Sequence, residues 1–404
     1  MEKLESSRFL TKRQYSEEPD SFRNPFQRDR DRIIHSRAFR RLMHKTQIFN
    51  ANKGDHFRNR LTHTLEVTQI ARSIGKRLNL HDELIEAIAL GHDLGHTPFG
   101  HVGERTLDEI LMKGILGEFE GIGENFKHNF QSLRVVDSLE TRYSDYKGLN
   151  LTLATREGML KHTSTKNKKY GLAIDLTDIN VDKPSFTLEG QVVAIADEIA
   201  QYTHDLEDGL RGNVITLEEL KGIGLTKKYI FDRDTTLTKK TILENGILQR
   251  LVGVLINDVV DYSLELISKY HEEKGMPGFS SKNDVYLSGC IEFTSDMKKL
   301  TEELDKKKRK LIITSQEISK SDSKAEHLIR QIYRAYFKHP NQLPDYILER
   351  YFSQAGRPLE RDRINDKELQ KDDRFHRIIC DHISGMTDQY AAREYMELYQ
   401  PEFY

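Results

Sequence analysis

The chain has 404 residues, of which 37% are hydrophobic; this is enough for a core, yet no stretch approaches the roughly 18 apolar residues of a membrane span. Its formal net charge of −2 gives no general attraction for polyanions, so a nucleic acid is not expected as the substrate. Cysteine occurs only at Cys290 and Cys380, and residues 1–15 lack an apolar segment of signal-peptide length, which together predict a cytoplasmic protein without a disulfide framework.

Helical periodicity recurs along most of the chain and predicts an all-α fold. We expect three parts: residues 1–25 as a loosely held N-terminal arm, residues 26–275 as the catalytic core, and residues 276–404 as a helical region packed on that core. The second boundary lies where Met276, Pro277 and Gly278 interrupt the periodicity.

Arginine is concentrated between Arg28 and Arg41, near the start of the core. The arginines alternate with acidic and apolar residues, which is typical of an amphipathic, packed helix with internal ion pairs. We therefore favour structural packing for this segment, with a nucleotide contact as a further role. Nucleic-acid binding is the competing interpretation, but it would normally be supported by a basic domain.

Three predicted helices carry a histidine or an aspartate in phase with an apolar stripe. These residues are His63, the adjacent pair His92 and Asp93, and Asp197. Their apolar partners are Val67, Ile70, Ile74 and Leu78 for His63, Ile85, Ile88 and Ala89 for His92, and Val193 and Ala200 for Asp197. Side chains in phase with such a stripe point inward when helices pack, so the four residues can converge on one point.

Two imidazoles and two carboxylates suit one divalent metal ion with positions left open for water or a phosphate oxygen. A single inward histidine is more often a hydrogen-bonded core residue, and a single inward aspartate is often a cap or an ion-pair partner. The set of four favours metal binding and predicts a metal-dependent hydrolase. The ligand types accept Mn, Fe, Co, Ni, Zn or Mg and do not choose among them.

The run HDLGHTPFGHVGE follows the second of these helices, over residues 92–104. Gly95, Pro98 and Gly100 end that helix and force a turn, after which residues 102–111 can start another helix. His101 and Glu104 are then three residues apart on one helical face, close enough for the carboxylate to orient and charge the imidazole. We expect this pair to transfer protons.

The remaining segments predict further helices and one excursion. Residues 162–189 are rich in Lys, Thr, Asp and Asn, and residues 170–176 and 185–188 could pair as a short β-hairpin near the site. Helices are expected over 216–229, 241–273, 325–336 and 375–399. The basic cluster at residues 306–310 is interpreted as a solvated helix face, with an allosteric nucleotide or subunit contact as the less favoured alternative.

Several segments resemble the HD superfamily of metal-dependent phosphohydrolases, whose signature is His, then His-Asp, then Asp. More narrowly, the chain is similar to the deoxynucleoside triphosphate triphosphohydrolases, often called dGTPases. The similar segments are residues 28–42, 44–49, 60–67, 92–104, 196–200, 204–208 and 385–388. The match is dense from about residue 23 to 212, and the arginine-rich segment and the 92–104 run are its most specific parts.

The resemblance implies a helical HD core that hydrolyses a deoxynucleoside triphosphate to the deoxynucleoside and inorganic triphosphate, with water attacking the α-phosphorus. It implies a divalent metal ion held by His63, His92, Asp93 and Asp197. His101 and Glu104 match the family's catalytic dyad, and His128 matches another active-site histidine near the phosphates. Relatives form homo-oligomers such as tetramers or hexamers, so another copy of the chain is the implied partner.

Substrate contacts are carried over from the same resemblance. Gln47 and Arg60 match positions near the nucleotide, Lys161 matches a phosphate-facing lysine, and Asp205 matches an acid that accepts a hydrogen bond from the sugar 3′ hydroxyl. The alternative interpretation is a solvated charge for Arg60 and Lys161 and an ordinary helix salt bridge for Asp205.

The chain departs from the family at one position. Many relatives have a tyrosine four residues after the last metal aspartate, where its ring backs the sugar, but this chain has Gln201 followed by Tyr202. Tyr202 is assigned to the substrate site, although a helix rotates it about 100° away from Gln201. Selection of deoxyribose over ribose is therefore less secure than hydrolysis itself.

Two other classes of function stay open. A different HD phosphohydrolase, such as a nucleotidase or a cyclic-nucleotide phosphodiesterase, would use the same metal ligands but would not need the pair His101 and Glu104. A non-catalytic nucleotide sensor or nucleic-acid-binding module ranks third, because a binder has no need for ionisable groups around a metal.

Overall fold

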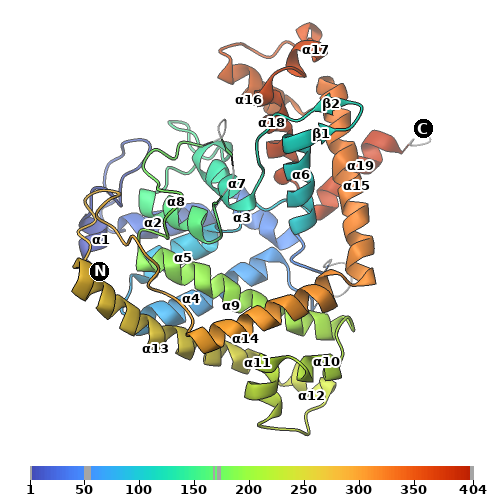
Figure 1. Cartoon of the computed structure of the whole chain (residues 1–404). Helices are drawn as coiled ribbons and strands as arrows, with labels where there is room; N and C mark the ends of the chain where they lie inside the picture. The colour runs from blue at the N-terminus through green and yellow to red at the C-terminus, as the bar shows by residue number, and fades with distance from the viewer. Residues whose placement is uncertain (1, 50–55, 167–168, 171–173, 401–404) are drawn as a thin grey trace.

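The computed structural model describes residues 2–49, 56–166, 169–170 and 174–400. These residues form helix after helix, with one small antiparallel sheet of two strands, so the predicted all-α fold is confirmed. Figure 1 shows helices stacked across a central body, with smaller groups of helices projecting above and below it. Within the described part of the chain, none of the helices combines the length and the apolar character that crossing a membrane requires.

Five helices form the central body that positions the candidate site. They are α2 (Pro25–Ile34), α4 (Arg60–Arg77), α5 (Asp82–Gly91), α8 (Leu153–Lys161) and α9 (Leu188–Arg211). Helix α5 packs against α2, α4, α8 and α9, and α4 also packs along α9. Apolar side chains from α4, α5 and α9 join one continuous hydrophobic core, which fixes these helices relative to one another.

Helix starts follow local capping chemistry. The Asn24 side chain caps α2, which begins with Pro25, and Asn59 and Thr187 cap α4 and α9. Ser36 caps a second helix, α3 (Arg37–Arg41), so the arginine-rich segment forms two short helices where one was expected. The predicted internal ion pair is present between Arg30 and Asp31, whereas other pairs join the segment to acids outside it: Arg30 with Glu86, and Arg28 and Arg32 with Glu17.

The N-terminal segment is docked on the central body, in contrast to the loosely held arm expected for residues 1–25. It begins with α1 (Glu2–Ser6), and the side chain of Leu10 is fully buried. The backbone carbonyls of Leu10 and Lys12 accept hydrogen bonds from Ala154 and Leu153 at the start of α8. Burial and backbone pairing hold this segment, although its polar composition suggested otherwise.

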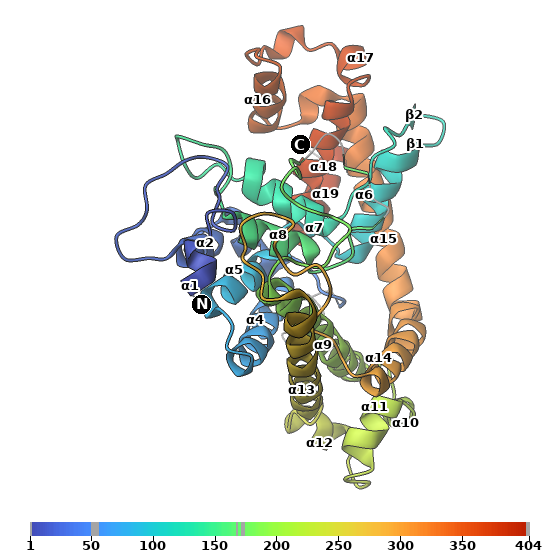
Figure 2. The same ribbon diagram turned by 60° about the vertical axis from the view of Figure 1, so that its left-hand side comes forward.

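A second hydrophobic core joins the C-terminal helices to one helix of the catalytic region. Helix α6 (His101–Lys113) packs against α15 (Gln316–Lys338) and α18 (Asp373–Ser384), and α15 packs against α19 (Asp388–Tyr399). Figure 2 shows α15 passing beside α6 and continuing toward α14. Because the first core also includes apolar residues from 279–304, the predicted division at residue 275 is crossed by shared packing, and this boundary stays a prediction.

The short hairpin lies elsewhere than expected. Strands β1 (Gly114–Ile115) and β2 (Phe119–Glu120) pair directly after α6. The described residues of the 170–188 excursion contain no strand, and residues 171–173 lie outside the described residues. Three carbonyl groups of this polar segment accept hydrogen bonds from a lysine side chain, as described below.

The other elements complete the two projecting groups and the connections. They are η1 (Leu42–His44), α7 (His128–Arg134), η3 (Val135–Leu139), α10 (Leu217–Lys221), α11 (Gly224–Thr226), η4 (Lys227–Phe231), α12 (Lys239–Glu244), α13 (Gln249–Lys274), α14 (Ser295–Lys308), η5 (Arg309–Ile313), η6 (Pro340–Gln342), α16 (Asp345–Gln354), η7 (Arg361–Arg363) and α17 (Asp366–Leu369).

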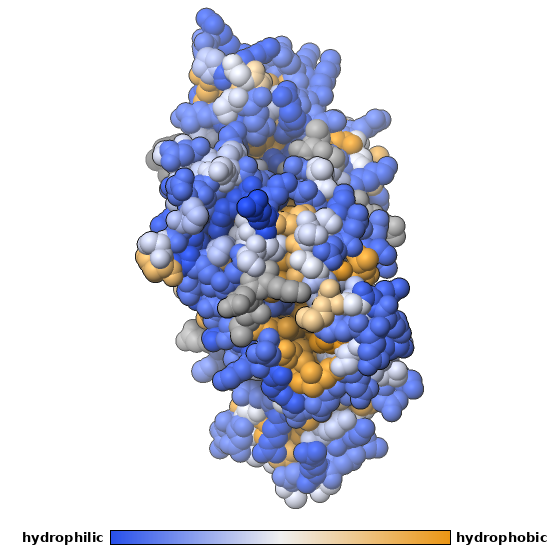
Figure 3. Space-filling model, turned by 90° about the vertical axis from the view of Figure 1, so that its left-hand side faces the viewer, coloured by the Kyte–Doolittle hydropathy of each residue, from blue (hydrophilic) through white to orange (hydrophobic). Residues whose placement is uncertain are grey.

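Figure 3 shows a largely hydrophilic face on which apolar side chains gather in a hollow at mid-height.

The basic cluster at residues 306–310 is only partly solvated. Lys308 at the end of α14 is buried and forms an ion pair with Asp205 of α9, with Nζ and Oδ2 2.9 Å apart. Arg309 is exposed and pairs with Asp305, as a solvated face predicts. The interpretation as a solvated face is therefore wrong for Lys308, which ties α14 to α9.

Candidate metal and catalytic centre

Three helices bring the four candidate metal ligands together. His63 comes from the first turn of α4, His92 and Asp93 follow the last residue of α5, and Asp197 comes from the middle of α9. His63 Nε2 lies 3.0 Å from Asp197 Oδ1, while His92 Nε2 lies 3.4 Å from Asp93 Oδ1 and 4.0 Å from Asp197 Oδ1. All four side chains are buried. The predicted convergence is thus present, and the role of these residues as ligands stays a prediction.

The donor set fits a divalent cation. His92 Nδ1 donates a hydrogen bond to the carbonyl of Ala89 at 2.6 Å, which leaves a lone pair on Nε2. That Nε2 atom is buried and has no hydrogen-bond partner. Candidate ligand atoms of His63, His92 and Asp93 lie within 4.8 Å of one another. A buried acceptor without a partner costs free energy, and a metal ion beside the two carboxylates would satisfy it.

Both carboxylates of the cluster are held in their ionised form. Burial acts to raise the pKa of Asp93, but the charges of His96, His92 and Arg60 hold it well below its ordinary value. Burial also acts to raise the pKa of Asp197, and the hydrogen bond and charge of His63 lower it. Ionised carboxylates are the form that binds a cation.

Arg60 and Gln47 offer unsatisfied polar atoms next to the cluster. Arg60 is buried and its Nη1 donates to Asp93 Oδ2 at 2.8 Å, whereas its Nε and Nη2 atoms have no partner. The Oε1 atom of Gln47 is likewise buried without a partner. Both residues approach Gly100, where an added Cβ would lie 3.2 Å from Arg60 Nη2 and 3.3 Å from the Gln47 carbonyl. Two predicted substrate contacts therefore meet at one place.

The direct partner of Glu104 is His128, whereas the spacing in the sequence suggested His101. Glu104 Oε2 accepts hydrogen bonds from His128 Nδ1 at 2.5 Å and from the His128 backbone at 2.9 Å. His101 is exposed, and its nearest ring nitrogen lies within 4.8 Å of a Glu104 oxygen. Burial acts to raise the pKa of Glu104, but the charge and hydrogen bond of His128 hold it well below its ordinary value. The Glu104 carboxylate thus binds His128 directly and lies near His101.

Three further histidines belong to the cluster and were not assigned from the sequence. His96 Nε2 lies 3.1 Å from Asp93 Oδ1, and its ring stacks on that of His128 with centroids 3.8 Å apart. His162 Nε2 lies 3.1 Å from His128 Nε2, and burial lowers the pKa of His162 to about 3. His204 Nδ1 lies 3.5 Å from His63 Nδ1. His96 stands three residues after Asp93, and this spacing in the sequence could have indicated that the two side chains lie close together.

Three predicted substrate contacts are engaged elsewhere. The Lys161 ammonium donates to the carbonyls of Asn180, Lys183 and Pro184 and pairs with Glu157 at 3.2 Å, so its three protons are already used. Asp205 pairs with Lys308, and that ammonium lies 5.6 Å from the centre of the Tyr202 ring. Lys161, Asp205 and Tyr202 are therefore used in internal contacts, contrary to their assignment as nucleotide contacts.

Gln201 has a structural role that its departure from the family pattern did not suggest. Its Nε2 donates to Asp197 Oδ2 at 3.0 Å, while Asp197 Oδ1 faces His63. The amide thereby occupies one carboxylate oxygen and leaves the other directed at the cluster.

Gly95 lets the turn after Asp93 pack directly on helix α7. A Cβ at this position would lie 2.1 Å from the Ser132 backbone nitrogen and 2.3 Å from the His128 carbonyl, so Gly95→Ala is expected to destabilise the protein by about 1–3 kcal/mol. Chemical denaturation measures this change. Gly253→Ala in α13, where an added Cβ meets no atom within 4 Å, is the control and should be neutral or stabilising by up to about 1 kcal/mol. Equal stability of the two variants would contradict the prediction.

A cluster of charges beside His204 should make stability depend on pH. Arg58 pairs with Glu66, Glu207 and Asp208, and burial raises the pKa of Asp208 from 3.8 to about 6. Because the folded-state pKa is raised, the stabilisation from this group is complete below pH 4 and is lost as the pH rises through about 6.

Asp208→Asn should therefore gain stability relative to wild type, by up to about 3 kcal/mol, as the pH rises from about 4 to 7. Urea denaturation of both proteins across this range measures the difference. Glu207→Gln removes a contact to the same guanidinium without removing the buried acid, and it should show no such gain. A constant difference between Asp208→Asn and wild type would count against the interpretation.

The C-terminal helices fasten two segments of the centre. Asp388 Oδ2 accepts hydrogen bonds from the backbone nitrogen (2.9 Å) and hydroxyl (2.5 Å) of Thr46, and its Oδ1 accepts from the Phe99 backbone at 2.8 Å. The buried Lys45 ammonium donates to the carbonyls of His96 and Ser384. The 385–388 segment thus helps to position both the segment that carries Gln47 and the 92–104 run.

Comparison with known proteins finds a matching family model in each half of the chain. Residues 60–202 match the HD domain, and residues 291–397 match the phosphohydrolase-associated domain. The chain is 38% identical over 393 residues to a deoxyguanosinetriphosphate triphosphohydrolase-like protein of Bordetella pertussis, with 96% of this chain and 93% of the relative covered. Proteins of the same description from Geobacter sulfurreducens (38% over 395 residues, 95% and 91% covered) and Nitrosomonas europaea (39% over 389 residues, 96% and 94% covered) are also similar.

Proposed function

The chain belongs to the family of deoxyguanosinetriphosphate triphosphohydrolase-like proteins, and we propose that it hydrolyses deoxynucleoside triphosphates to the deoxynucleoside and inorganic triphosphate. The coarser assignment, a hydrolase of the HD phosphohydrolase class, follows from the family itself. The observation that best supports the finer proposal is the buried His and Asp cluster within the matched HD domain, directly beside His101, Glu104 and His128.

His63, His92, Asp93 and Asp197 would hold the divalent metal ion, because their candidate ligand atoms are close together and His92 Nε2 has no other partner. A metal ion bound there supplies positive charge that polarises the α-phosphate and offsets the charge of the triphosphate.

Arg60 and Gln47 orient the nucleotide. The two unpartnered nitrogens of the Arg60 guanidinium donate charge-assisted hydrogen bonds to phosphate oxygens. Gln47 Oε1 accepts a hydrogen bond from a hydroxyl of the sugar. Binding of the substrate thereby removes the cost of leaving these buried atoms without partners.

His101 transfers the proton to the leaving group. Water attacks the α-phosphorus, the bond from phosphorus to the 5′ oxygen breaks, and the 5′ oxygen takes a proton from the His101 imidazole. The proton that the attacking water loses passes to solvent, and solvent returns a proton to His101. Desolvation by the surrounding protein lowers the pKa of His101 to about 4, and the Glu104 carboxylate, within 4.8 Å, and the negative charge of the bound triphosphate act in the opposite direction and favour the protonated ring. His128, held by Glu104, lies on the phosphate side.

Product analysis tests the proposal. Purified protein is incubated with a divalent metal ion and each of the four deoxynucleoside triphosphates, and the products are resolved by anion-exchange and reversed-phase chromatography. We expect deoxynucleoside and inorganic triphosphate in equal amounts. Nucleoside diphosphate with orthophosphate, or monophosphate with pyrophosphate, would reject the proposed bond cleavage, and activity on a nucleoside monophosphate or a cyclic nucleotide alone would point to the alternative HD phosphohydrolases. Ribonucleoside triphosphates are tested in parallel, because Gln201 stands where relatives have tyrosine.

We also propose a homo-oligomer and the division into an arm (1–25), a core (26–275) and a C-terminal region (276–404). Light scattering coupled to gel filtration measures the subunit number, and limited proteolysis locates the boundaries.

A further inference from the structure

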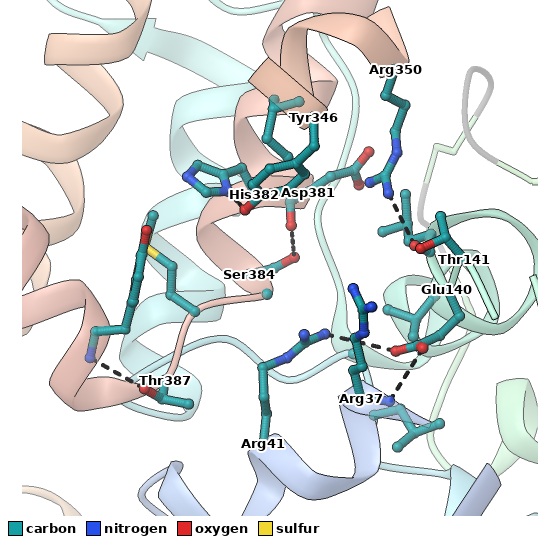
Figure 4. Close-up of a pocket in the computed structure, with 18 residues that line it drawn as sticks. Arg37, Arg41, Glu140, Thr141, Tyr346, Arg350, Asp381, His382, Ser384 and Thr387 are labelled. Carbon is teal, nitrogen blue, oxygen red and sulfur yellow. Dashed lines mark hydrogen bonds and ion pairs between the residues drawn. The ribbon is translucent and has the colours of Figure 1, made fainter. Parts of the chain in front are cut away.

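A cavity of about 370 Å³ lies between α3, η3, α16 and the end of α18, and Leu94 and Gly95 also line it. Figure 4 shows its polar lining. None of the four candidate metal ligands lines it, nor do His101, Glu104 or His128. The cavity is therefore separate from the proposed catalytic centre, and its volume lies in the range of small-ligand sites.

Three guanidinium groups from two separate parts of the chain converge on this cavity. Arg37 and Arg41 come from α3 and Arg350 comes from α16, and Figure 4 shows them around its rim. Arg37 is exposed and forms no ion pair within the described part of the chain. Arg350 donates to the carbonyl of Leu139 at 3.0 Å. Arg37 and Arg41 are two of the six arginines of the arginine-rich segment, Arg350 is distant from them in the sequence, and the catalytic proposal uses none of the three.

The two carboxylates that line the cavity are already engaged by other groups. Asp381 accepts hydrogen bonds from Arg134 at 2.7 to 2.9 Å and from Gln131 at 3.0 Å. Glu140 accepts from the backbone nitrogens of Arg37 and Ala38, and Arg41 Nη2 lies 4.0 Å away from it. The lining thus holds three arginines and two acids, and Asp381 is already paired with Arg134, which does not line the cavity.

Buried donors without partners line the same space. His382 is 6% exposed and its Nε2 has no hydrogen-bond partner. The Tyr346 hydroxyl lies 3.5 Å from His382 Nδ1; a hydrogen bond donated by the hydroxyl places the ring proton on Nε2. Arg41 Nε is also buried without a partner. Burial lowers the pKa of Arg41 and of Arg350, which indicates that their charges lack full compensation.

We propose that this cavity binds a small anion carrying phosphate groups, held by Arg37, Arg41 and Arg350 and by a hydrogen bond from His382. Guanidinium groups match the geometry of phosphate oxygens and form charge-assisted hydrogen bonds with them. Tyr346, Tyr390 and Met386 line the remaining wall and leave room for an apolar or aromatic part of the ligand. Free inorganic polyphosphate and the phosphate groups of a nucleotide share this chemistry. The proposal does not depend on the proposed catalytic activity.

Isothermal titration calorimetry of the full chain, freed of metal by dialysis against a chelator, tests the site with inorganic triphosphate as the first probe and adenosine triphosphate as the second. We expect binding by wild type that weakens by at least about tenfold in Arg37→Gln and in Arg350→Gln, since each loses a charge-assisted contact. Arg40→Gln is the matched control, because Arg40 is an exposed arginine of the same helix that does not line the cavity. It should bind as wild type does.

His92→Ala separates this cavity from the metal cluster, and it should bind the probes unchanged. The proposal is overturned if neither probe binds wild type, if Arg37→Gln and Arg350→Gln bind as tightly as Arg40→Gln, or if His92→Ala alone abolishes binding. Tighter binding of adenosine triphosphate than of inorganic triphosphate would identify a nucleotide as the source of the phosphate groups, and equal binding would identify free polyphosphate. Circular dichroism of each variant shows that the fold is retained.

Discussion

His92→Ala is expected to abolish stoichiometric binding of a divalent metal ion and to lower kcat by at least about a thousandfold, since metal catalysis contributes several kcal/mol to transition-state stabilisation. The reason lies in the orientation of the ring. Its Nδ1 atom is committed to the Ala89 carbonyl, and its Nε2 atom is directed at the carboxylates without a partner of its own. Alanine removes this candidate metal-binding nitrogen and leaves the two ionised carboxylates with less compensation of their negative charge.

Metal content per chain, measured by mass spectrometry after dialysis, and kcat from product formation test this prediction together. His35→Ala is the control, because His35 is an exposed histidine at the end of α2 and outside the cluster. It should keep the metal content and kcat of wild type. A His92→Ala protein that retains one metal ion per chain and hydrolyses at the wild-type rate would remove His92 from the site.

Glu104→Gln is expected to lower kcat by about 10²–10⁴-fold, the usual contribution of positioned proton transfer, while metal content stays unchanged. Glutamine keeps the shape of the side chain but not its charge. The hydrogen bond at 2.5 Å to His128 Nδ1 weakens, and the negative charge near His101 is lost. The His101 imidazole then holds a proton less well.

This pattern distinguishes proton transfer from metal binding, because His92→Ala should lose both metal and activity whereas Glu104→Gln should lose activity alone. Glu109→Gln on the exposed side of the same helix, where Glu109 pairs with Arg330, serves as the control and should leave kcat within about twofold. If Glu104→Gln retains nearly full kcat, the carboxylate has no part in proton transfer.

The helices were predictable because their signals are local. Asn24 with Pro25, and Asn59, mark helix starts by side chains that bind the first free backbone nitrogens. Docking of the N-terminal segment was not predictable, since it depends on pairing of Leu10 and Lys12 with residues about 140 positions later. The hairpin was predicted in the wrong segment for a different reason, because alternation over so few residues is a weak signal.

For the candidate site, the apolar phase of His63, His92 and Asp197 was sufficient to predict that they converge. Lys161 and Asp205 show where such reasoning fails. Lys161 is bound by carbonyl groups of residues 180–184, and a sequence says nothing about where carbonyls point. The partner of Asp205 is Lys308, within a basic run that alone suggests solvent exposure. Charged residues are ambiguous until their partners are known.

The hydrogen bonds of Asp388 to Thr46 and Phe99 join positions 342 and 289 residues apart. During synthesis on the ribosome, all four candidate metal ligands emerge well before this aspartate does. The segments carrying Gln47 and Phe99 therefore lack these hydrogen bonds until residue 388 has been synthesised. A chain that stops before residue 388 would keep all four candidate metal ligands but lose the contact that holds both segments in place.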